Sequence, residues 1–443
     1  MAQNERSELL KTLLAAEEPE RLKLLKSLSD EQRKEFRHHW KVWARSDQLT
    51  PPGDWRLWLI MAGRGFGKTR AGAEWVRAVA KANPQARIAL VGASLTDGRS
   101  VMVEGESGLL EVSSPRGAPS YEPSLRRVTW PNGAQATLYS AYEPESLRGP
   151  QHSHAWCDEV AKWDNANGRA VRCWDNLQMG LRLGKVPRVL ATTTPRAVPL
   201  LKRLLTGAGT AITRGTTEDN ADNLPARFVA DIRREYGKSL LGRQELDGEL
   251  IADIEGALWT RALLETVRES AASSPAVRVV VAVDPPASAT GDACGIVVCA
   301  LGEDGIARVL ADASMEKPSP ERWARKVAQV AAAWRADRVV AEANQGGAMV
   351  GSVLRAAEIS LPIKLVHASR GKVARAEPVA ALYEAGRVRH AGMFARLEDE
   401  LCGLVSGGRY EGPGRSPDRA DALVWGLTEL LLGRPSVPRV RST

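Results

Sequence analysis

The stretch LWLIMAGRGFGKTRAGAEW, residues 57–75, runs from an apolar segment through a glycine-rich turn into a helical pattern. Glycines let successive backbone N–H groups curl around phosphate oxygens, and the start of the following helix adds the positive end of its dipole. In such a turn, Lys68 would reach the terminal phosphates and the Thr69 hydroxyl would ligate magnesium. The sequence therefore predicts a phosphate-binding loop, made of Gly63, Arg64, Gly65, Phe66, Gly67, Lys68 and Thr69.

The turn departs from the GxxxxGK[ST] pattern in one place, because Ala62 stands where the first glycine would be. An arginine, Arg64, also lies inside the loop. The alternative interpretation is a strand-to-helix turn that binds no nucleotide. The apolar strand before the turn and the helical pattern after it favour the phosphate loop.

Outward from this turn, short apolar runs alternate with helical stretches from Trp55 to about Gly215. This alternation predicts an α/β domain with a mostly parallel sheet flanked by helices. In the same sheet, HSHAWCDEVAKW places two acids at a strand end, where Asp158 would hold magnesium through water and Glu159 would orient the attacking water. A pair of acids at a solvated helix start is the alternative.

Two further segments of this half can serve nucleotide hydrolysis. Arg148 is either an arginine finger that stabilises charge on the transferred phosphoryl group or an ordinary arginine on a surface loop. RVLATTTPR ends a strand with three hydroxyls, Thr192 to Thr194, with Thr193 at their centre. Hydroxyls at this position can sense the terminal phosphate and pass hydrolysis on to a moving element. The alternative is threonines that satisfy the local backbone.

The second half has a different order of elements. Three successive strands, VRVVVAVDPP, DACGIVVCALG and GIARVLADAS, are joined by short turns, which predicts antiparallel pairing. A helix, a strand, a helix, a further strand and more helices follow. This order matches the RNase H-like fold.

Three carboxylates of this half stand in apolar surroundings: Asp284 and Glu342 end predicted strands, and Asp421 lies in a predicted helix. Because such charges are costly to desolvate, a metal ion is their natural partner where they converge. Two Mg²⁺ or Mn²⁺ ions about 4 Å apart would activate water and stabilise the leaving oxygen in phosphodiester hydrolysis. Asp292 and Asp418 are candidates for outer ligands or a fourth acid. The alternative is that each acid is solvated separately.

With 443 residues, the chain is long enough for two domains. We expect a helical segment over residues 1–45, a P-loop ATPase domain over 46–265 with a helical subregion from about 217, a linker near 266–276, and a nuclease domain over 277–443.

Composition narrows the class of protein. The formal charge of +8 favours a polyanionic partner. The five cysteines lack metal-ligand spacing, and no apolar run reaches the length of a membrane span, so we expect a cytoplasmic protein without a zinc site or a disulfide framework. Basic residues in or beside loops of the second half suit contacts with the backbone of duplex DNA: Arg370, Lys372, Arg375, Arg387 and Arg389.

An ATPase with an arginine-bearing phosphate loop joined to an RNase H-like nuclease resembles the large terminase subunit of tailed phages and gene transfer agents. Over nearly the whole chain, the family's order is kept by GRGFGKTRAGAEW, LRGPQHSHAWCDEVAKW, ATTTPR, VAVDPP, VVAEANQGG and DRADALVW. The resemblance implies that the cofactors are ATP and Mg²⁺, and that ATP is bound and hydrolysed by Lys68, Thr69, Asp158 and Glu159. It implies that Arg64 and Arg148 stabilise charge and that Thr192 to Thr194 form a coupling motif. It assigns two Mg²⁺ or Mn²⁺ ions to Asp284, Glu342 and Asp421.

The resemblance also implies a motor that drives double-stranded DNA through a portal into a capsid and a nuclease that cuts the DNA at the start and end of filling. The expected partners are double-stranded DNA, the portal protein and the small terminase subunit. On the portal, we expect several copies of the chain to form a ring, although the chain can be monomeric in isolation. The expected place is the host cytoplasm, at the procapsid. RSDQLTPP, near Gln48, is the candidate for the adenine contact. The alternative function is a P-loop DNA helicase or translocase whose C-terminal domain binds DNA without cutting it.

Overall fold

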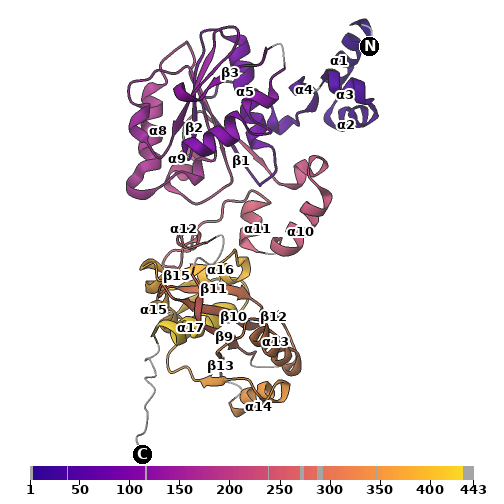
Figure 1. Cartoon of the computed structure of the whole chain (residues 1–443). Coiled ribbons are helices and arrows are strands. Elements are labelled where there is room, and N and C mark those ends of the chain that lie inside the picture. The colour runs from indigo at the N-terminus through magenta and orange to yellow at the C-terminus, as the bar shows by residue number, and fades with distance from the viewer. Residues whose placement is uncertain are drawn as a thin grey trace, which may run out of the picture. The chain divides into compact units, whose positions relative to one another are not determined.

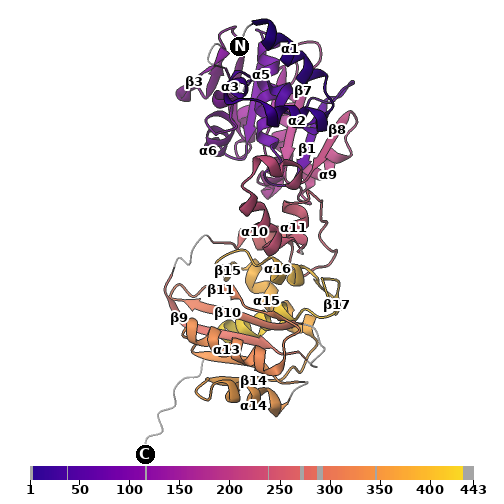
Figure 2. The same cartoon turned by 90° about the vertical axis from the view of Figure 1, so that its right-hand side faces the viewer.

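The computed structural model describes residues 3–36, 38–114, 117–237, 239–269, 274–286, 293–344 and 347–432. The chain forms two compact units, each with its own sheet (Figure 1 and Figure 2). Unit 1 comprises Met1–Lys238 and Gly242–Ala252, and unit 2 comprises Ser239–Leu241 and Asp253–Thr443. Within the described ranges, no helix has both the length and the apolar character needed to cross a membrane.

Unit 1 contains a sheet of eight strands in the order β3-β4-β5-β2-β6-β7-β1-β8. Neighbours from β5 to β8 are parallel, whereas β3 and β4 form an antiparallel ribbon beside β5. The predicted mostly parallel sheet is thus confirmed. The strands are β1 (Leu57–Ala62), β2 (Arg87–Gly92), β3 (Ser120–Glu122), β4 (Arg127–Thr129), β5 (Gln135–Ser140), β6 (His154–Cys157), β7 (Arg188–Thr193) and β8 (Thr210–Gly215).

Helices surround this sheet and precede it. The first four form a small core of their own, made of Leu13, Leu25, Leu28, Phe36 and Val42. The helices are α1 (Gln3–Ala15), α2 (Glu18–Ser27), α3 (Asp30–Phe36), α4 (Trp40–Trp43), α5 (Lys68–Ala82), α6 (Leu95–Asp97), α7 (Leu109–Val112), α8 (Arg169–Gly180), α9 (Pro199–Leu205), α10 (Ala226–Tyr236) and α11 (Leu240–Glu245).

Strand β1 lies inside the sheet and is buried along its whole length, as its unbroken apolar sequence requires. Trp58 belongs to the core that contains Val76 of α5, and Leu59 belongs to the opposite core, which contains Leu177 of α8. Helices therefore cover both faces of the sheet (Figure 1). The loop after β1 consequently starts from a strand that is fixed on every side.

Unit 2 contains a sheet in the order β14-β13-β9-β10-β11-β15, with β12 paired to β10. β9, β10 and β11 pair antiparallel, which confirms the prediction, and β13, β14 and β15 join in parallel. The strands are β9 (Ala276–Asp284), β10 (Ala293–Gly302), β11 (Ala307–Asp312), β12 (Met315–Glu316), β13 (Arg338–Glu342), β14 (Ile363–Val366) and β15 (Val388–His390), with a separate hairpin of β16 (Leu404–Val405) and β17 (Arg409–Tyr410).

The helices of unit 2 are α12 (Arg261–Thr266), α13 (Pro320–Ala333), α14 (Ala348–Ala357), α15 (Lys372–Glu384), α16 (Ala395–Cys402) and α17 (Asp418–Leu427). Adjacent residues of β9 enter opposite cores. Val280 lies in the core with Val379 of α15 and Leu423 of α17, whereas Val281 lies in the core with Val327 of α13. The sheet is therefore covered on both faces (Figure 2).

The division between the units differs from the predicted one, which assigned residues up to 265 to the first domain. Residues 253–265 pack with unit 2 instead. The Trp259 side chain is fully buried, with its ring 5.7 Å from that of Tyr383, and the N–H of Leu258 donates to the Leu404 carbonyl at 2.8 Å. Burial of this tryptophan explains why the chain leaves unit 1 before the polar segment that suggested a linker.

Candidate active sites

The phosphate loop connects β1 to α5, and its backbone needs glycine at several positions. Gly65 and Gly67 have φ angles of +75° and +96°, in the left-handed region that other residues rarely adopt. A Cβ atom on Gly67 would lie 2.4 Å from Nε2 of Gln48, and one on Gly63 would lie 2.2 Å from the Leu246 carbonyl oxygen. The loop therefore has a tightly held backbone.

Lys68 is the first residue of α5, and its ammonium group lies inside the loop. It donates to the carbonyls of Ala62 and Gly63 at 2.9 and 3.0 Å and to Oγ1 of Thr194 at 3.1 Å, and it is 3.6 Å from Oε1 of Glu159. The side chain is buried. When a phosphate enters the loop, its oxygens would replace the two carbonyls as acceptors of the hydrogen bonds from Lys68. Thr69, one residue further on, is half-buried.

The two predicted acids at the end of β6 have opposite pKa shifts. Burial, reinforced by Glu159, raises the pKa of Asp158 to about 6, although Oδ1 of Asp158 accepts a 2.7 Å hydrogen bond from the Thr192 hydroxyl. Burial also acts against ionisation of Glu159, but Lys68 and the N–H of Thr194 outweigh it, so the pKa of Glu159 lies below its usual value. Glu159 has a φ of +48°, a strained conformation for a residue with a side chain.

The threonine run at the end of β7 lies against both acids and the lysine. Oγ1 of Thr192 accepts the N–H of Glu159 at 3.2 Å, and Thr194 receives Lys68 and donates its N–H to Glu159. The Thr193 hydroxyl instead accepts the N–H of Ala161 at 3.2 Å and donates to the Thr194 carbonyl. Parallel pairing of β6 and β7, with β7 beside β1, brings these strand ends to one edge.

The two candidate arginines, Arg64 and Arg148, lie in different surroundings. The Arg64 side chain forms a short ion pair with Glu245, and the Arg64 N–H donates to the Glu245 carbonyl at 2.7 Å. Arg148 has a side chain that is 70% exposed and pairs with Glu145 at 3.0 Å. Among the described residues, no hydrogen bond or ion pair joins Arg148 to the phosphate loop.

Several residues that hold the loop were missed in the sequence. The Thr217 hydroxyl donates to the Arg64 carbonyl at 2.7 Å, and Asn220 Nδ2 donates to the Gly65 carbonyl at 2.6 Å. Arg45 reaches the Phe66 carbonyl at 2.6 Å, with its guanidinium 4.7 Å from the Phe66 ring. These residues are far from the loop in sequence and belong to no motif.

Gln48, predicted near the adenine, lies beside the loop. Its side chain is buried, and Nε2 donates to the Phe66 carbonyl at 3.3 Å. A contact with adenine stays a prediction.

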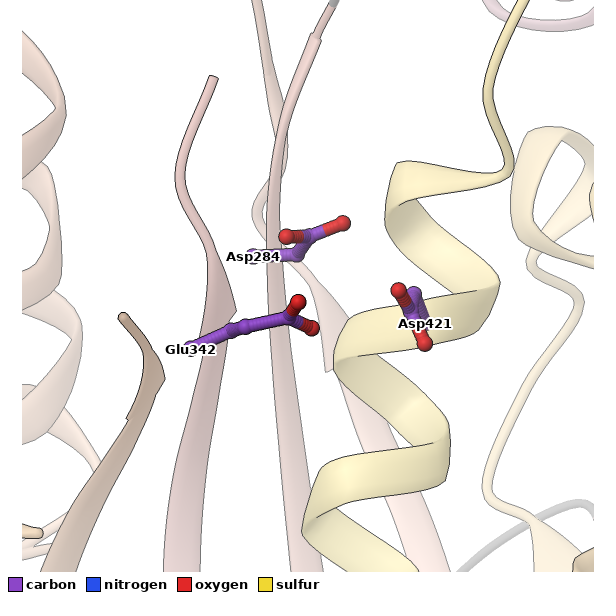
Figure 3. Close-up of side chains that lie close together, drawn as sticks. All are labelled: Asp284, Glu342 and Asp421. Atoms are coloured by element: carbon purple, nitrogen blue, oxygen red, sulfur yellow. The ribbon is translucent and has the colours of Figure 1, made fainter. Parts of the chain in front are cut away.

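In unit 2, the three predicted acids converge. Asp284 ends β9, Glu342 ends β13 and Asp421 lies in α17, and Figure 3 shows their carboxylates turned toward one another. One oxygen from each lies within 4.8 Å of the others. Because β9 and β13 are parallel neighbours, with Val283 opposite Ala341, their last residues lie side by side. Hard oxygen ligands in this arrangement fit Mg²⁺ or Mn²⁺.

Helix α17 lies very close to the sheet at this point. Gly295 of β10 pairs with Asp284 of β9, and a Cβ atom on Gly295 would lie 2.0 Å from the Asp418 carbonyl oxygen. The glycine therefore permits the approach of the helix that carries Asp421 to the strand that carries Asp284.

Two side chains of α15 point into the acid cluster. Nζ of Lys372 is 3.2 Å from Asp284 and 3.1 Å from Asp421, and NH2 of Arg375 donates to both oxygens of Asp421 at 2.6 and 2.7 Å. Burial raises the pKa of Asp284 well above its usual range, an effect that Lys372 opposes and the other two acids reinforce. Oε2 of Glu342 accepts the Trp425 indole N–H at 2.7 Å.

The remaining residues predicted for the site in unit 2 have different outcomes. Asp418, the first residue of α17, is buried with one oxygen 3.6 Å from Lys372, whereas Asp292 lies outside the described residues. Lys372 and Arg375 contact the acids, because the buried negative cluster attracts them, and their contact with the DNA backbone stays a prediction. In the described part of the chain, no hydrogen bond or ion pair joins the other three arginines to the acids: Arg370 and Arg387 are exposed, and Arg389 is half-buried beside Glu269.

Together the two units define a class of protein in which a P-loop α/β domain is joined to an RNase H-like domain. Residues 59–266 match the family model described as terminase large subunit, T4likevirus-type, N-terminal. Residues 281–430 match the model described as terminase RNaseH-like domain. The matches span most of both units, and the chain belongs to the terminase large subunit family.

Solved structures give distant likenesses. The large terminase of a thermophilic bacteriophage, in complex with ADP, is 13% identical, with a TM-score of 0.41 over 91% of this chain and 99% of that one. The HK97 bacteriophage large terminase is 15% identical, with a TM-score of 0.35 over 91% and 95%. The large terminase nuclease from thermophilic phage G20c with bound cobalt is 15% identical, with a TM-score of 0.30 over 40% and 98%. None of the curated proteins compared with the chain matches it. The family assignment rests on the two domain models.

Proposed function

We propose that the chain is a DNA-packaging motor. ATP hydrolysis in unit 1 drives double-stranded DNA through a portal into a procapsid, and a metal-dependent endonuclease in unit 2 cuts the DNA when packaging starts and ends. One observation carries the proposal: a single chain contains both a phosphate loop bonded to acids and threonines, and a converging triad of carboxylates. Family membership supports both assignments.

At the ATP site, Lys68 turns from the loop carbonyls to the β- and γ-phosphates, and the loop N–H groups bind the phosphate oxygens. Thr69 and Asp158 hold magnesium, which neutralises charge on the phosphates when it is bound. Glu159, whose lowered pKa keeps it ionised, orients the attacking water. Arg64 stabilises the developing negative charge.

The threonine run couples hydrolysis to movement. When Lys68 leaves Thr194, the hydrogen bonds that join β7 to Glu159 rearrange, and the segment that leads from β7 into α9 shifts with them. Thr217 and Glu245 transmit displacement of the loop to the helical subregion of unit 1, because both are bonded to Arg64.

At the nuclease site, Asp284, Glu342 and Asp421 hold two divalent ions, Mg²⁺ or Mn²⁺, which activate water and stabilise the leaving oxygen when bound. Trp425 orients Glu342 through its indole N–H.

The small terminase subunit supplies the DNA, and several chains form a ring on the portal. In such a ring the exposed Arg148 completes the ATP site of a neighbouring copy.

Cleavage of plasmid DNA tests the proposal. The purified chain, incubated with supercoiled plasmid and Mn²⁺, should nick and linearise it, and Asp284→Ala should abolish cleavage while ATP turnover persists. Glu303→Ala, which removes an exposed carboxylate of the same unit, is the matched control and should cleave at the wild-type rate. Glu159→Gln should bind ATP without turning it over.

Two results would contradict the proposal. Cleavage by Asp284→Ala at the wild-type rate would remove the triad from the reaction. No cleavage by any variant, with ATP turnover intact, would favour a DNA translocase whose second domain binds without cutting.

A further inference from the structure

Each of the three acids in the nuclease site is bonded to a cation from the first turn of α15. Lys372 contacts Asp284 and Asp421, and Arg375 contacts Asp421 and, at 3.3 Å, Oε2 of Glu342. Carboxylate oxygens that would bind metal ions therefore already accept hydrogen bonds. A divalent ion must compete with these two side chains for the same lone pairs.

The formal charges of the cluster indicate how many divalent ions it can hold while the two cations are in place. Counted with every carboxyl group ionised, Asp284, Glu342, Asp418 and Asp421 face two cations, so the formal charge of the cluster is no more negative than −2. One divalent ion balances this charge. A second ion leaves an excess of positive charge in a buried site, which is unfavourable unless the cations withdraw or a phosphate enters.

Both cations have features of groups that can leave. The Lys372 side chain is 35% exposed and lines a cavity of about 630 Å³ beside Ser416 and the β16–β17 hairpin, which gives its ammonium room to move. Nε of Arg375 is buried without a hydrogen-bond partner among the described residues, so the guanidinium is incompletely satisfied in its present position.

We propose that Lys372 and Arg375 form a cation lock, which limits the acid triad to one divalent ion until DNA phosphates draw the two side chains away. The lock rests on the proposed nuclease function and adds a control to it. A site closed in this way binds its second ion only when a strand is in place, so the free protein does not hold the full set of metal ions before DNA enters.

Mn²⁺ binding to the full-length protein, measured without DNA by calorimetry and by the loss of the free-ion electron paramagnetic resonance signal, tests the lock. Wild type should bind one ion in unit 2. Arg375→Gln and Lys372→Gln should each bind a second ion. Arg325→Gln removes an exposed arginine of α13 in the same unit and should behave as wild type. The same titration with Asp284→Ala identifies the ions held by the triad.

A short DNA duplex provides the second arm. Adding it should raise the occupancy of wild type from one ion to two and should leave Lys372→Gln unchanged, because that variant is already open. If loss of Arg375 prevents folding, Lys372→Gln carries the test, since its side chain is partly exposed.

Each contrary result has a distinct meaning. Wild-type affinity and stoichiometry in both variants, or weaker binding in both, would overturn the lock and leave the nuclease function standing. Occupancy by one ion in wild type saturated with DNA would overturn the role of the phosphates. Equal Mn²⁺ binding by wild type and Asp284→Ala would overturn the nuclease site itself.

Discussion

The Thr192 hydroxyl donates to Oδ1 of Asp158 at 2.7 Å and accepts the N–H of Glu159 at 3.2 Å. One fully buried side chain of β7 thus holds both acids at the end of β6. This arrangement ties the proposed coupling segment to the proposed chemistry through a single group.

Thr192→Val should slow ATP turnover by about tenfold, the factor that corresponds to about 1.4 kcal/mol. Valine keeps the shape but leaves a buried carboxylate and a buried N–H without partners, which should also cost about 1–3 kcal/mol of stability. Steady-state ATPase assays and urea unfolding measure the two effects. Thr210→Val, at a half-buried position on β8, is the control, and equal turnover in the two variants would contradict the role of Thr192.

Glu245→Gln should tighten nucleotide binding several-fold, because the Arg64 guanidinium no longer divides its charge between Glu245 and the phosphates. Titration with a fluorescent ATP analogue measures the affinity. Glu249→Gln, which breaks an exposed ion pair with Arg243 in the same segment, should have no effect. Weaker binding by Glu245→Gln would mean that Glu245 instead presents Arg64 to the nucleotide.

Trp425→Phe should lower DNA cleavage by about tenfold and raise the Mn²⁺ concentration needed for half-maximal cleavage, while ATP turnover stays unchanged. Phenylalanine retains the ring beside Arg375 but removes the indole N–H that orients Glu342. The comparison is Trp334→Phe, at a 40% exposed position after α13. An unaltered metal requirement in Trp425→Phe would make the indole contact merely structural.

His152 should make the stability of unit 1 fall as the pH drops from about 6.5 to about 4. His154, whose pKa burial also lowers to about 4, acts in the same direction, and Asp158, whose pKa is raised to about 6, acts in the opposite one. Burial lowers the pKa of His152 to about 4, so in this range the unfolded chain takes up a proton that the folded chain does not, and below it the difference is constant. The contribution is on the order of 3 kcal/mol. His152→Phe, which retains the ring contact with Tyr139, should flatten the pH dependence of urea unfolding. An unchanged slope would show that the pKa of His152 is the same in the folded and the unfolded chain.

A fragment of residues 253–443 should unfold at higher denaturant concentration than one of residues 277–443. The shorter fragment loses Trp259 and Leu264, both buried in the core of unit 2, at a cost of about 3–5 kcal/mol for the tryptophan alone. Trp259→Ala in the longer fragment should reproduce most of the loss. Equal stability of the two fragments would place the boundary near residue 277.

The phosphate loop and the strand-end acids could be predicted because their signals are local. A glycine-rich turn between a strand and a helix limits the backbone by itself, and parallel pairing then brings Asp158 and Thr192 together at one edge. Glu245 could not be found in this way, since it is 181 residues from Arg64 and only the tertiary fold brings them together.

The position of Lys372 and Arg375 could not be predicted either. A lysine at the start of a helix has the same sequence pattern whether it faces solvent, DNA or a buried acid. The predicted position of the boundary between the units was wrong for a related reason. Loss of hydrophobicity marks where a chain is polar, whereas the division depends on which core receives Trp259.

Gly295 carries no functional group, yet it sets the spacing between the two halves of the nuclease site, because it admits α17 against β10 opposite Asp284. A random mutagenesis screen for cleavage would therefore score Gly295 together with the acids. An added methyl group there would silence cutting by separating Asp421 from Asp284, with all three carboxylates and the ATP site intact. If the chain has the function proposed above, Gly295→Ala gives a variant that retains ATP turnover and loses DNA cleavage, although every ligand side chain is still present.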